Sequence, residues 1–285
     1  MILDTLASAA KARVAKLEKQ KSLAAVREEA EQIYKREVSY FKGLADKFSG
    51  TKADGTQAVR ITGRRFFQAN LQRPGLNFIC ECKKASPSKG LIAPEFHYLQ
   101  IAKAYEAGGA AAISVLTEPE YFLGSDAYLK EIAAQVSLSV LRKDFTVSPY
   151  QIYEAKLLGA SAVLLICAIL SPAQLEEYRL AAESIGLDAL VETHNAEEME
   201  MALNSGAKII GINNRNLKDF SVDMGTCLKL RDEIPEDRIC IAESGIRNKE
   251  DIRQLKEARF NGVLIGETLM RSGNPEQMLR ELREA

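Results

Sequence analysis

The sequence predicts an α/β protein of the TIM barrel class, a (β/α)8 barrel with an N-terminal helical extension. From about Asn77 onward, short apolar runs alternate with stretches of helical periodicity, as in a parallel sheet covered by helices. This strand–helix unit occurs eight times, which favours a closed barrel over an open sheet. The chain has 285 residues, of which 46% are hydrophobic, and is long enough to form the barrel as one domain.

The predicted strands are short and almost entirely apolar. Gly-Ala pairs such as Gly109-Ala110 precede several of them, where the glycine ends a helix in a left-handed cap. No Gly-x-Gly-x-x-Gly motif follows the first strand, which weighs against a dinucleotide-binding fold. We predict strands at Phe78–Cys82, Ala111–Leu116, Ser139–Arg142, Ala162–Cys167, Ala189–Glu192, Ile209–Ile212, Ile239–Ala242 and Val263–Ile265, with helices such as Glu95–Ala107, Pro149–Leu158, Pro172–Ile185 and Ala196–Asn204 between them.

Residues 1–75 are predicted to form a helical extension packed on the barrel, within a single domain of residues 1–285. The segment is rich in Ala, Glu, Lys and Leu but has too few apolar residues for a core of its own. We expect part of it to cover the carboxyl-terminal mouth of the barrel, with Phe41, Phe66 and Phe67 nearest the mouth. The alternative is a solubilising helix on the outer ring.

The composition argues against several kinds of partner and location. There are 38 Lys and Arg residues against 39 Asp and Glu, a net charge of -1, so no basic surplus favours nucleic acid or an anionic membrane. No apolar run is long enough to span a bilayer, and the first thirty or so residues carry charges throughout, unlike a secretory signal. Five irregularly spaced cysteines favour a reducing, cytoplasmic location over a disulfide framework or a metal site.

Charged residues stand where the predicted strands end. Glu81 and Lys83 share one face at the end of the first strand, and Cys82 lies on the other face. Buried unpaired charges are costly, and barrel enzymes place catalytic side chains at these strand ends. A single charged residue at a strand end can simply lie in solvent at the rim of the barrel. The pattern recurs, however, at five later strand ends, with Lys143, Glu192, Asn213, Glu243 and Glu267.

Glycines after the last two strands predict a phosphate site. Gly245 and Gly266 let backbone N–H groups converge on an anion at close range. The loops after the seventh and eighth strands are the usual phosphate seat of such barrels. The alternative is that both glycines serve only to form ordinary turns.

The residue types at the strand ends favour acid–base chemistry. No histidine stands at a strand end, and His194, just past Glu192, is expected at the surface, so a Ser-His-Asp triad is not predicted. Neighbouring cations are expected to lower the pKa of Lys83 or Lys143 and so make it a proton donor near neutral pH. The residues alone therefore predict an enzyme acting on an anionic sugar phosphate.

Six motifs, in this order along the chain, resemble the indole-3-glycerol phosphate synthase family. They are Glu-Cys-Lys-x-x-Ser-Pro-Ser, Leu-Arg-Lys-Asp-Phe, Leu-Val-Glu, Gly-Ile-Asn-Asn-Arg-Asn-Leu, Ala-Glu-Ser-Gly-Ile and Ile-Gly-Glu-Thr-Leu-Met-Arg, between about Phe78 and Arg271. The resemblance implies ring closure of 1-(2-carboxyphenylamino)-1-deoxyribulose 5-phosphate with loss of carbon dioxide and water, in tryptophan biosynthesis. It implies no cofactor and no metal, and a small-molecule substrate. We expect a monomer or weak homodimer.

The resemblance also implies roles for individual residues. Lys143 is the general acid on the sugar carbonyl, and Glu192 is the base, or the acid in the dehydration. Lys83 lies by the substrate carboxylate, and Glu81 positions the lysines. The other implied site residues hold hydroxyls, carboxylate or phosphate, support these groups, or form an apolar floor: Asn213, Ser244, Arg215, Glu243, Ser86, Gly245, Gly266 and Glu267, with Leu116, Phe122 and Leu164 as the floor.

Two other functions are compatible with the predicted fold. Phosphoribosylanthranilate isomerase resembles it but works with a Cys–Asp pair, whereas alternation turns Cys82 away from Glu81 and Lys83. A non-catalytic phosphate-binding barrel would be expected to have lost the charged or amide residues at one or more strand ends, and no such loss is seen.

Overall fold

The structure, a computed structural model, confirms the barrel. It describes residues 2–48, 67–216 and 219–285. Eight parallel strands close in the order β1-β10-β9-β8-β7-β6-β5-β4, and Phe78 of the first strand pairs with Val263 of the last. The strands are β1 Asn77–Cys82, β4 Ala112–Leu116, β5 Ser139–Lys143, β6 Ala162–Ile166, β7 Asp188–Thr193, β8 Ile209–Asn213, β9 Ile239–Glu243 and β10 Gly262–Ile265.

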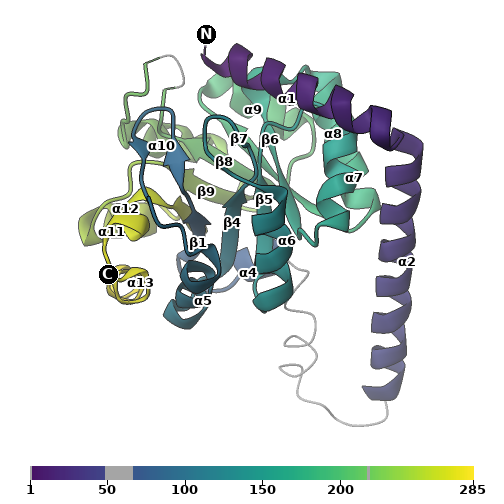
Figure 1. Ribbon diagram of the computed structural model, residues 1–285. Helices are drawn as coiled ribbons and strands as arrows, with labels where there is room; N and C mark the ends of the chain where they lie inside the picture. The colour runs from purple at the N-terminus through teal and green to yellow at the C-terminus, as the bar shows by residue number, and fades with distance from the viewer. Residues whose placement is uncertain (1, 49–66, 217–218) are drawn as a thin grey trace.

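Helices cover the outside of the barrel (Figure 1). Several begin at side-chain caps, such as Ser171, whose Oγ accepts from Gln174 N in a capping box. The outer helices are α5 Tyr98–Gly108, α6 Asp126–Gln135, α7 Pro149–Leu157, α8 Pro172–Ser184, α9 Ala196–Asn204, α10 Gly225–Leu230, α11 Lys249–Glu257, α12 Glu267–Arg271 and α13 Pro275–Arg283, with the 3-10 turns η1 Cys167–Ile169 and η2 Arg231–Glu233. A small hairpin that the sequence analysis did not predict, β2 Ala85–Ser86 with β3 Gly90–Leu91, follows β1.

Two apolar layers hold the barrel together. Alternate strand residues such as Ile79 and Leu141 fill the interior, and their neighbours, such as Phe78 and Cys80, pack under the helices. Cys82 belongs to the outer layer. The thiol at this strand end therefore does not face the barrel interior, where the Cys–Asp pair of an isomerase would need it.

The amino-terminal end of the barrel is closed by α4 Phe67–Leu71. Phe67 and Leu71 are fully buried in the inner layer. Gln68 N donates to Asp188 Oδ2 at 2.8 Å, at the start of β7, which fixes the helix to this end. The prediction that Phe67 lies near the mouth is wrong, because this apolar side chain plugs the opposite end. Phe66 lies outside the described residues.

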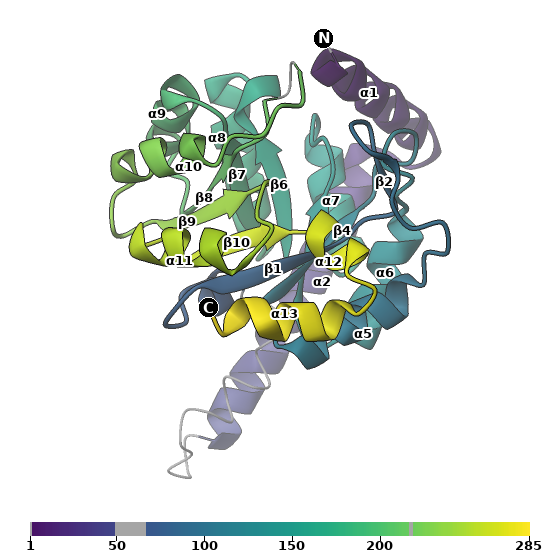
Figure 2. The same cartoon turned by 90° about the vertical axis from the view of Figure 1, so that its left-hand side faces the viewer.

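The first helix of the extension lies over the mouth. In Figures 1 and 2, α1 Ile2–Gln20 crosses the end of the barrel where the strands finish, and α2 Leu23–Phe48 turns away down its side. Arg13 Nη2 donates to both oxygens of Asp144, at 2.6 and 2.7 Å, and so ties α1 to the end of β5. Phe41, on α2, does not line the mouth cavities described below, contrary to expectation. Among the described residues, no helix is long and apolar enough to cross a membrane.

Candidate active site

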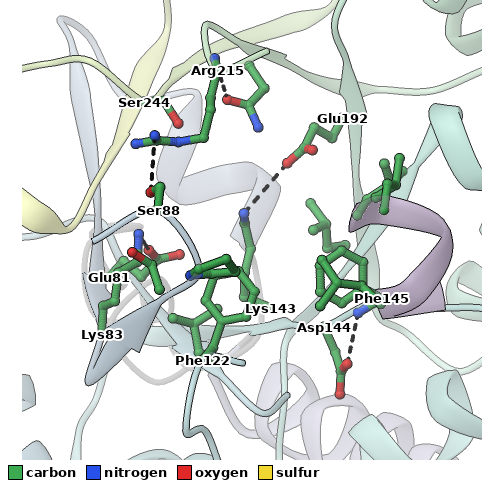
Figure 3. Close-up of a pocket in the computed structure, with 18 of the residues that line it drawn as sticks. Glu81, Lys83, Ser88, Phe122, Lys143, Asp144, Phe145, Glu192, Arg215 and Ser244 are labelled. Atoms are coloured by element: carbon green, nitrogen blue, oxygen red, sulfur yellow. Dashed lines mark hydrogen bonds and ion pairs between the residues drawn. The ribbon is translucent and has the colours of Figure 1, made fainter. Parts of the chain in front are cut away.

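Two adjoining cavities open at the carboxyl ends of the strands, and they share a wall of charged groups. The apolar cavity is lined by side chains such as Leu116, Phe122 and Leu164, and the polar cavity by the loops after β9 and β10. Figure 3 shows charged side chains from several strands pointing toward one another across the apolar cavity. The residues that line both cavities are Glu81, Lys83, Ser88, Lys143, Arg215, Phe220, Ser244 and Glu267.

Glu81 and Lys83 form an ion pair at the end of β1. Lys83 Nζ lies 2.5 Å from Glu81 Oε1, and Ser114 Oγ donates to Glu81 Oε2 at 3.3 Å. Burial alone would raise the pKa of Glu81, but Lys83 and Lys143 outweigh it and lower the pKa. Gly266 packs against this carboxylate, because a Cβ there would lie 3.0 Å from Glu81 Oε1. The glycine therefore also leaves room for Glu81.

Lys143 lies between two carboxylates. Its Nζ is 3.5 Å from Glu192 Oε2 and 3.5 Å from Glu243 Oε2. Burial would lower the pKa of Lys143, but Glu243, Glu192 and Glu81 outweigh it and raise the pKa. The expectation that cations lower the pKa of this lysine is wrong, because its nearest charged neighbours are carboxylates.

Glu243 is a buried member of this cluster rather than an outer support. Burial raises its pKa to about 8, with Glu192 and Glu81 adding to the rise and Lys143 opposing it. Gly211, on the adjacent strand β8, makes space for the carboxylate, since a Cβ there would lie 2.1 Å from Glu243 Oε1. Burial therefore favours the protonated form of Glu243, whereas Lys143 favours the ionised form.

Glu192 is a second carboxylate of the cluster whose ionised form is favoured. Burial would raise its pKa, but Lys143 and His194 lower it to about 2. His194 Nε2 lies 3.4 Å from Glu192 Oε1, and the histidine side chain is only 13% exposed. His194 is therefore not the surface residue that the sequence analysis expected. Asn213 also hydrogen-bonds Glu192 and lines the apolar cavity.

Buried acids shape the apolar wall. Glu118 accepts from the backbone N–H groups of residues 120–122 at 2.7 to 2.9 Å, which fixes the loop carrying Phe122. Asp144 accepts from Phe145 N at 2.8 Å, and the rings of Phe122 and Phe145 lie 6.1 Å apart. Side chains from α1 complete this wall opposite the lysines: Ile2, Leu3 and Leu6.

The polar cavity has the features of an anion site. Ser244 and Gly245 both have positive φ, 66° and 86°, in the turn after β9. Arg247 and Arg271 line the cavity, and Glu267 pairs with Arg271 at 3.2 Å. Gly266 and Glu267, both predicted from the sequence, line this cavity, whereas Ser86 lines only the apolar cavity. Arg215 Nη1 donates to Ser88 Oγ at 3.3 Å across the mouth (Figure 3).

Comparison with known proteins identifies the family. The family model for indole-3-glycerol phosphate synthase matches residues 31–282. The indole-3-glycerol phosphate synthase of Endomicrobium trichonymphae is 50% identical over 284 residues, 100% of both chains, and that of Lacticaseibacillus paracasei is 49% identical over 284 residues, 100% of this chain and 99% of the relative. This chain belongs to the indole-3-glycerol phosphate synthase family. Its activity is the ring closure, with decarboxylation and dehydration, that forms indole-3-glycerol phosphate, a lyase reaction of tryptophan biosynthesis.

More distant solved structures share the barrel of the synthase family. KGPDC from Streptococcus mutans matches with a TM-score of 0.57 at 11% identity, covering 73% of this chain and 96% of that chain. Thiamine phosphate pyrophosphorylase from Pyrococcus furiosus matches with a TM-score of 0.55 at 18% identity, covering 73% and 94%. At these identities the likeness shows the fold alone.

Several residues of the candidate site were not predicted from the sequence. Phe145 directly follows the Lys143-Asp144 pair, and its place after a charged strand end was a usable signal. The α1 residues carried no such signal, because any amphipathic helix has apolar positions like theirs. The cations of the polar cavity lie in loops or in the last turn of a helix, where a charged residue is ordinary: Lys89, Arg247 and Arg271.

Proposed function

We propose that the substrate spans the two cavities, with its aromatic ring in the apolar cavity and its phosphate in the polar cavity. The apolar cavity offers Phe122 and Phe145 as ring contacts, whereas the polar cavity offers Arg247 and Arg271 to a phosphate. The carbonyl carbon and the attacking ring carbon then lie at the wall that both cavities share. Binding at the two ends orients the reacting atoms.

Lys143 is the general acid in this proposal. The observation that carries the proposal is the position of Lys143 Nζ on the shared wall, 3.5 Å from both Glu192 and Glu243. The surrounding carboxylates keep its ammonium protonated, so it meets the carbonyl oxygen with a proton to give. An ammonium at this point also stabilises the negative charge that develops as the ring closes.

The other charged groups divide the remaining work. Glu192, ionised at neutral pH, takes the proton that leaves the methylene carbon during dehydration. Lys83 lies by the substrate carboxylate, and Glu81 holds Lys83 at 2.5 Å. Asn213 and Ser244 hydrogen-bond the substrate's polar groups. Arg215, bridging to Ser88, orients the loops around them.

Proton balance constrains this scheme. Two protons reach the carbonyl oxygen, which leaves as water, and one proton leaves the methylene carbon. The carboxylate leaves as carbon dioxide. Each turnover of the carboxylate form therefore consumes one proton from solvent.

Glu192→Gln tests the division of roles. The amide keeps the shape of the side chain but cannot accept the proton, so we expect kcat to fall by about 10²–10⁴-fold. A substrate analogue with its carbonyl reduced to an alcohol should bind the variant within about threefold of wild type, a difference of about 0.7 kcal/mol. Indole fluorescence measures turnover, and calorimetry measures binding. Loss of binding together with turnover would overturn the role.

The proposal assigns all of these groups to one chain, as a single domain of residues 1–285 acting as a monomer or weak homodimer in the cytoplasm. The five cysteines are all buried thiols, which fits a reducing compartment. No nucleic acid, membrane, metal or cofactor takes part in the scheme. Sedimentation at assay concentration tests the oligomeric state.

A further inference from the structure

The turn that follows β9 carries backbone strain beside the polar cavity. Ser244 has a φ of 66° and Gly245 a φ of 86°, and both residues line that cavity. Glycine adopts positive φ freely, but a serine does so at a cost and keeps this conformation only where its surroundings hold it. The contacts that hold Ser244 therefore decide how the turn faces the cavity.

One of these contacts comes from a buried asparagine at the end of the neighbouring strand. Asn214 directly follows β8 and is only 3% exposed. Its Nδ2 donates to Ser244 O at 3.0 Å, and its backbone N donates to Glu243 O at 2.9 Å. Asn214 lines neither the apolar nor the polar cavity. Any effect of this side chain on a ligand in those cavities is therefore exerted through the turn.

Asn214 is itself fixed from the α10 side. Its Oδ1 accepts from Cys227 N at 2.9 Å, and its Nδ2 lies 3.3 Å from Met224 Sδ. Met224 also packs against Gly245, since a Cβ on that glycine would lie 3.2 Å from the same sulfur. Because both polar atoms of the amide have partners, the amide has one favourable orientation. Ser244 O is therefore held in one place.

The far side of the turn is held by α12. Thr268 Oγ1 donates to Ile246 O at 2.6 Å. Between these two supports, the N–H groups of Gly245 and Ile246 donate to no backbone oxygen of the described residues. Successive N–H groups in a turn of this kind can bind one anion together, and Arg247 lines the same cavity. The turn therefore combines fixed ends with backbone donors that a ligand can use.

We infer that Asn214 is a positioning residue for the phosphate of the substrate, because its amide holds Ser244 and Gly245 at positive φ and keeps the backbone donors of the turn on the polar cavity. The inference rests on the proposed binding of the phosphate in that cavity. Without the amide, Ser244 O loses its donor and the strained backbone relaxes, so the N–H groups no longer meet one anion. Lys143 and Glu192 lie on other strands, so the loss affects binding more than the chemical step.

Asn214→Ala tests this role, with inorganic phosphate as a competitive inhibitor. We expect KM and the inhibition constant of phosphate each to rise by about tenfold, with kcat within about threefold of wild type. Benzoate, a probe of the apolar cavity, should inhibit the variant and wild type equally. Asn214→Leu, which fills the space of the amide without its hydrogen bonds, should show the same rise if the alanine variant folds poorly. In Gly245→Val, whose turn is already displaced, adding Asn214→Ala should raise the inhibition constant by less than about threefold, because both changes disrupt one turn.

A second buried asparagine is a matched control. Asn77 Nδ2 donates to the backbone oxygen of Gly75, also a residue of positive φ, at 3.2 Å, but at the amino-terminal end of the barrel. Asn77→Ala should lower the melting temperature and leave inhibition by phosphate unchanged. The inference is overturned if Asn214→Ala keeps the wild-type inhibition constant, or if its effect multiplies fully with that of Gly245→Val. Failure of the proposed function looks different, because Gly245→Val alone would then leave inhibition by phosphate unchanged.

Discussion

Arg142 and Lys143 are neighbours on β5, yet they stand in two ion clusters of opposite character. Arg142 points outward under the helices, where Asp126 and Glu154 each lie 2.8 Å from Nη2 and the backbone oxygen of Gln151 accepts at 3.0 Å. Lys143 points inward, and its two nearest carboxylates each lie 3.5 Å away. Both side chains are largely buried, at 2% and 16% exposed.

The difference separates a structural cluster from the proposed catalytic one. A guanidinium with close, aligned acceptors loses little by burial, because its hydrogen bonds replace water. An ammonium whose contacts are longer can still donate a hydrogen bond to a substrate oxygen. We therefore expect changes in the outward cluster to affect stability first, and changes in the inward cluster to affect turnover first.

Lys143→Ala should have the largest effect on turnover. Removing the proposed general acid should lower kcat by about 10²–10⁴-fold, with binding of the reduced analogue and the melting temperature close to wild type. Indole fluorescence and calorimetry measure these quantities. A variant that keeps more than about a tenth of wild-type kcat would contradict the assignment.

Arg142→Leu should reverse that pattern. It removes the guanidinium from Asp126 and from Glu154, whose side chain is only 15% exposed, whereas Asp144 keeps its contact with Arg13, so the free energy of unfolding should fall by about 3–5 kcal/mol. The activity of the remaining folded protein should fall far less than in Lys143→Ala. Urea denaturation, with kcat corrected for the folded fraction, measures both. If kcat per folded molecule falls as in Lys143→Ala, the two clusters are not separable.

The sequence was enough to predict the barrel and the charged strand ends, because strand periodicity decides which residues point inward. It was not enough to predict the pKa of Lys143, which depends on three carboxylates from other strands. The same holds for His194, whose burial depends on Glu198 and the α9 cap. The position of Phe67 was missed because an apolar side chain fits either end of a barrel, and only the anchoring of Gln68 to Asp188 decides which.

Deleting residues 2–20 extends the comparison to α1, the helix that lies over the mouth. The deletion removes Ile2, Leu3 and Leu6 from the apolar wall and the Arg13 contact from Asp144. We expect KM to rise by about tenfold, the loss of about 1.4 kcal/mol of binding, and kcat to fall as water enters. Steady-state kinetics measures both constants, with circular dichroism as the check on folding. Normal turnover by a folded, truncated protein would show that α1 has no part in the site.

Gly245→Val tests the polar cavity in the same way. The residue has φ +86, and a Cβ would lie 2.7 Å from Val222 Cγ1, so the turn must shift where the phosphate is proposed to bind. We expect KM to rise by about tenfold with a smaller change in kcat. Gly75→Val is the matched control, because its φ is +88, no atom of the described residues lies within 4 Å of an added Cβ, and it precedes β1 at the other end of the barrel. Equal KM changes in the two variants would rule out a local effect on the phosphate.

The smallest expected effect concerns stability, and it has opposite signs for the two carboxylates beside Lys143. The folded pKa of Glu243 is raised to about 8, so ionising it costs stability as pH rises from its ordinary value of 4.5 to about 8. The folded pKa of Glu192 is lowered to about 2, so its contribution to stability is present above pH 4.5 and is lost as pH falls toward 2. At pH 8, Glu243→Gln should therefore be more stable than wild type by about 1 kcal/mol, and Glu192→Gln less stable by a similar amount. Urea denaturation of both variants at pH 5 and pH 8 measures this, and the Glu243→Gln advantage should shrink at pH 5. Parallel stability curves for wild type and Glu243→Gln would mean that Glu243 is ionised throughout. In that case Glu243 would form an ordinary ion pair with Lys143, and the charges of the inward cluster would be paired as well as those of the outward cluster.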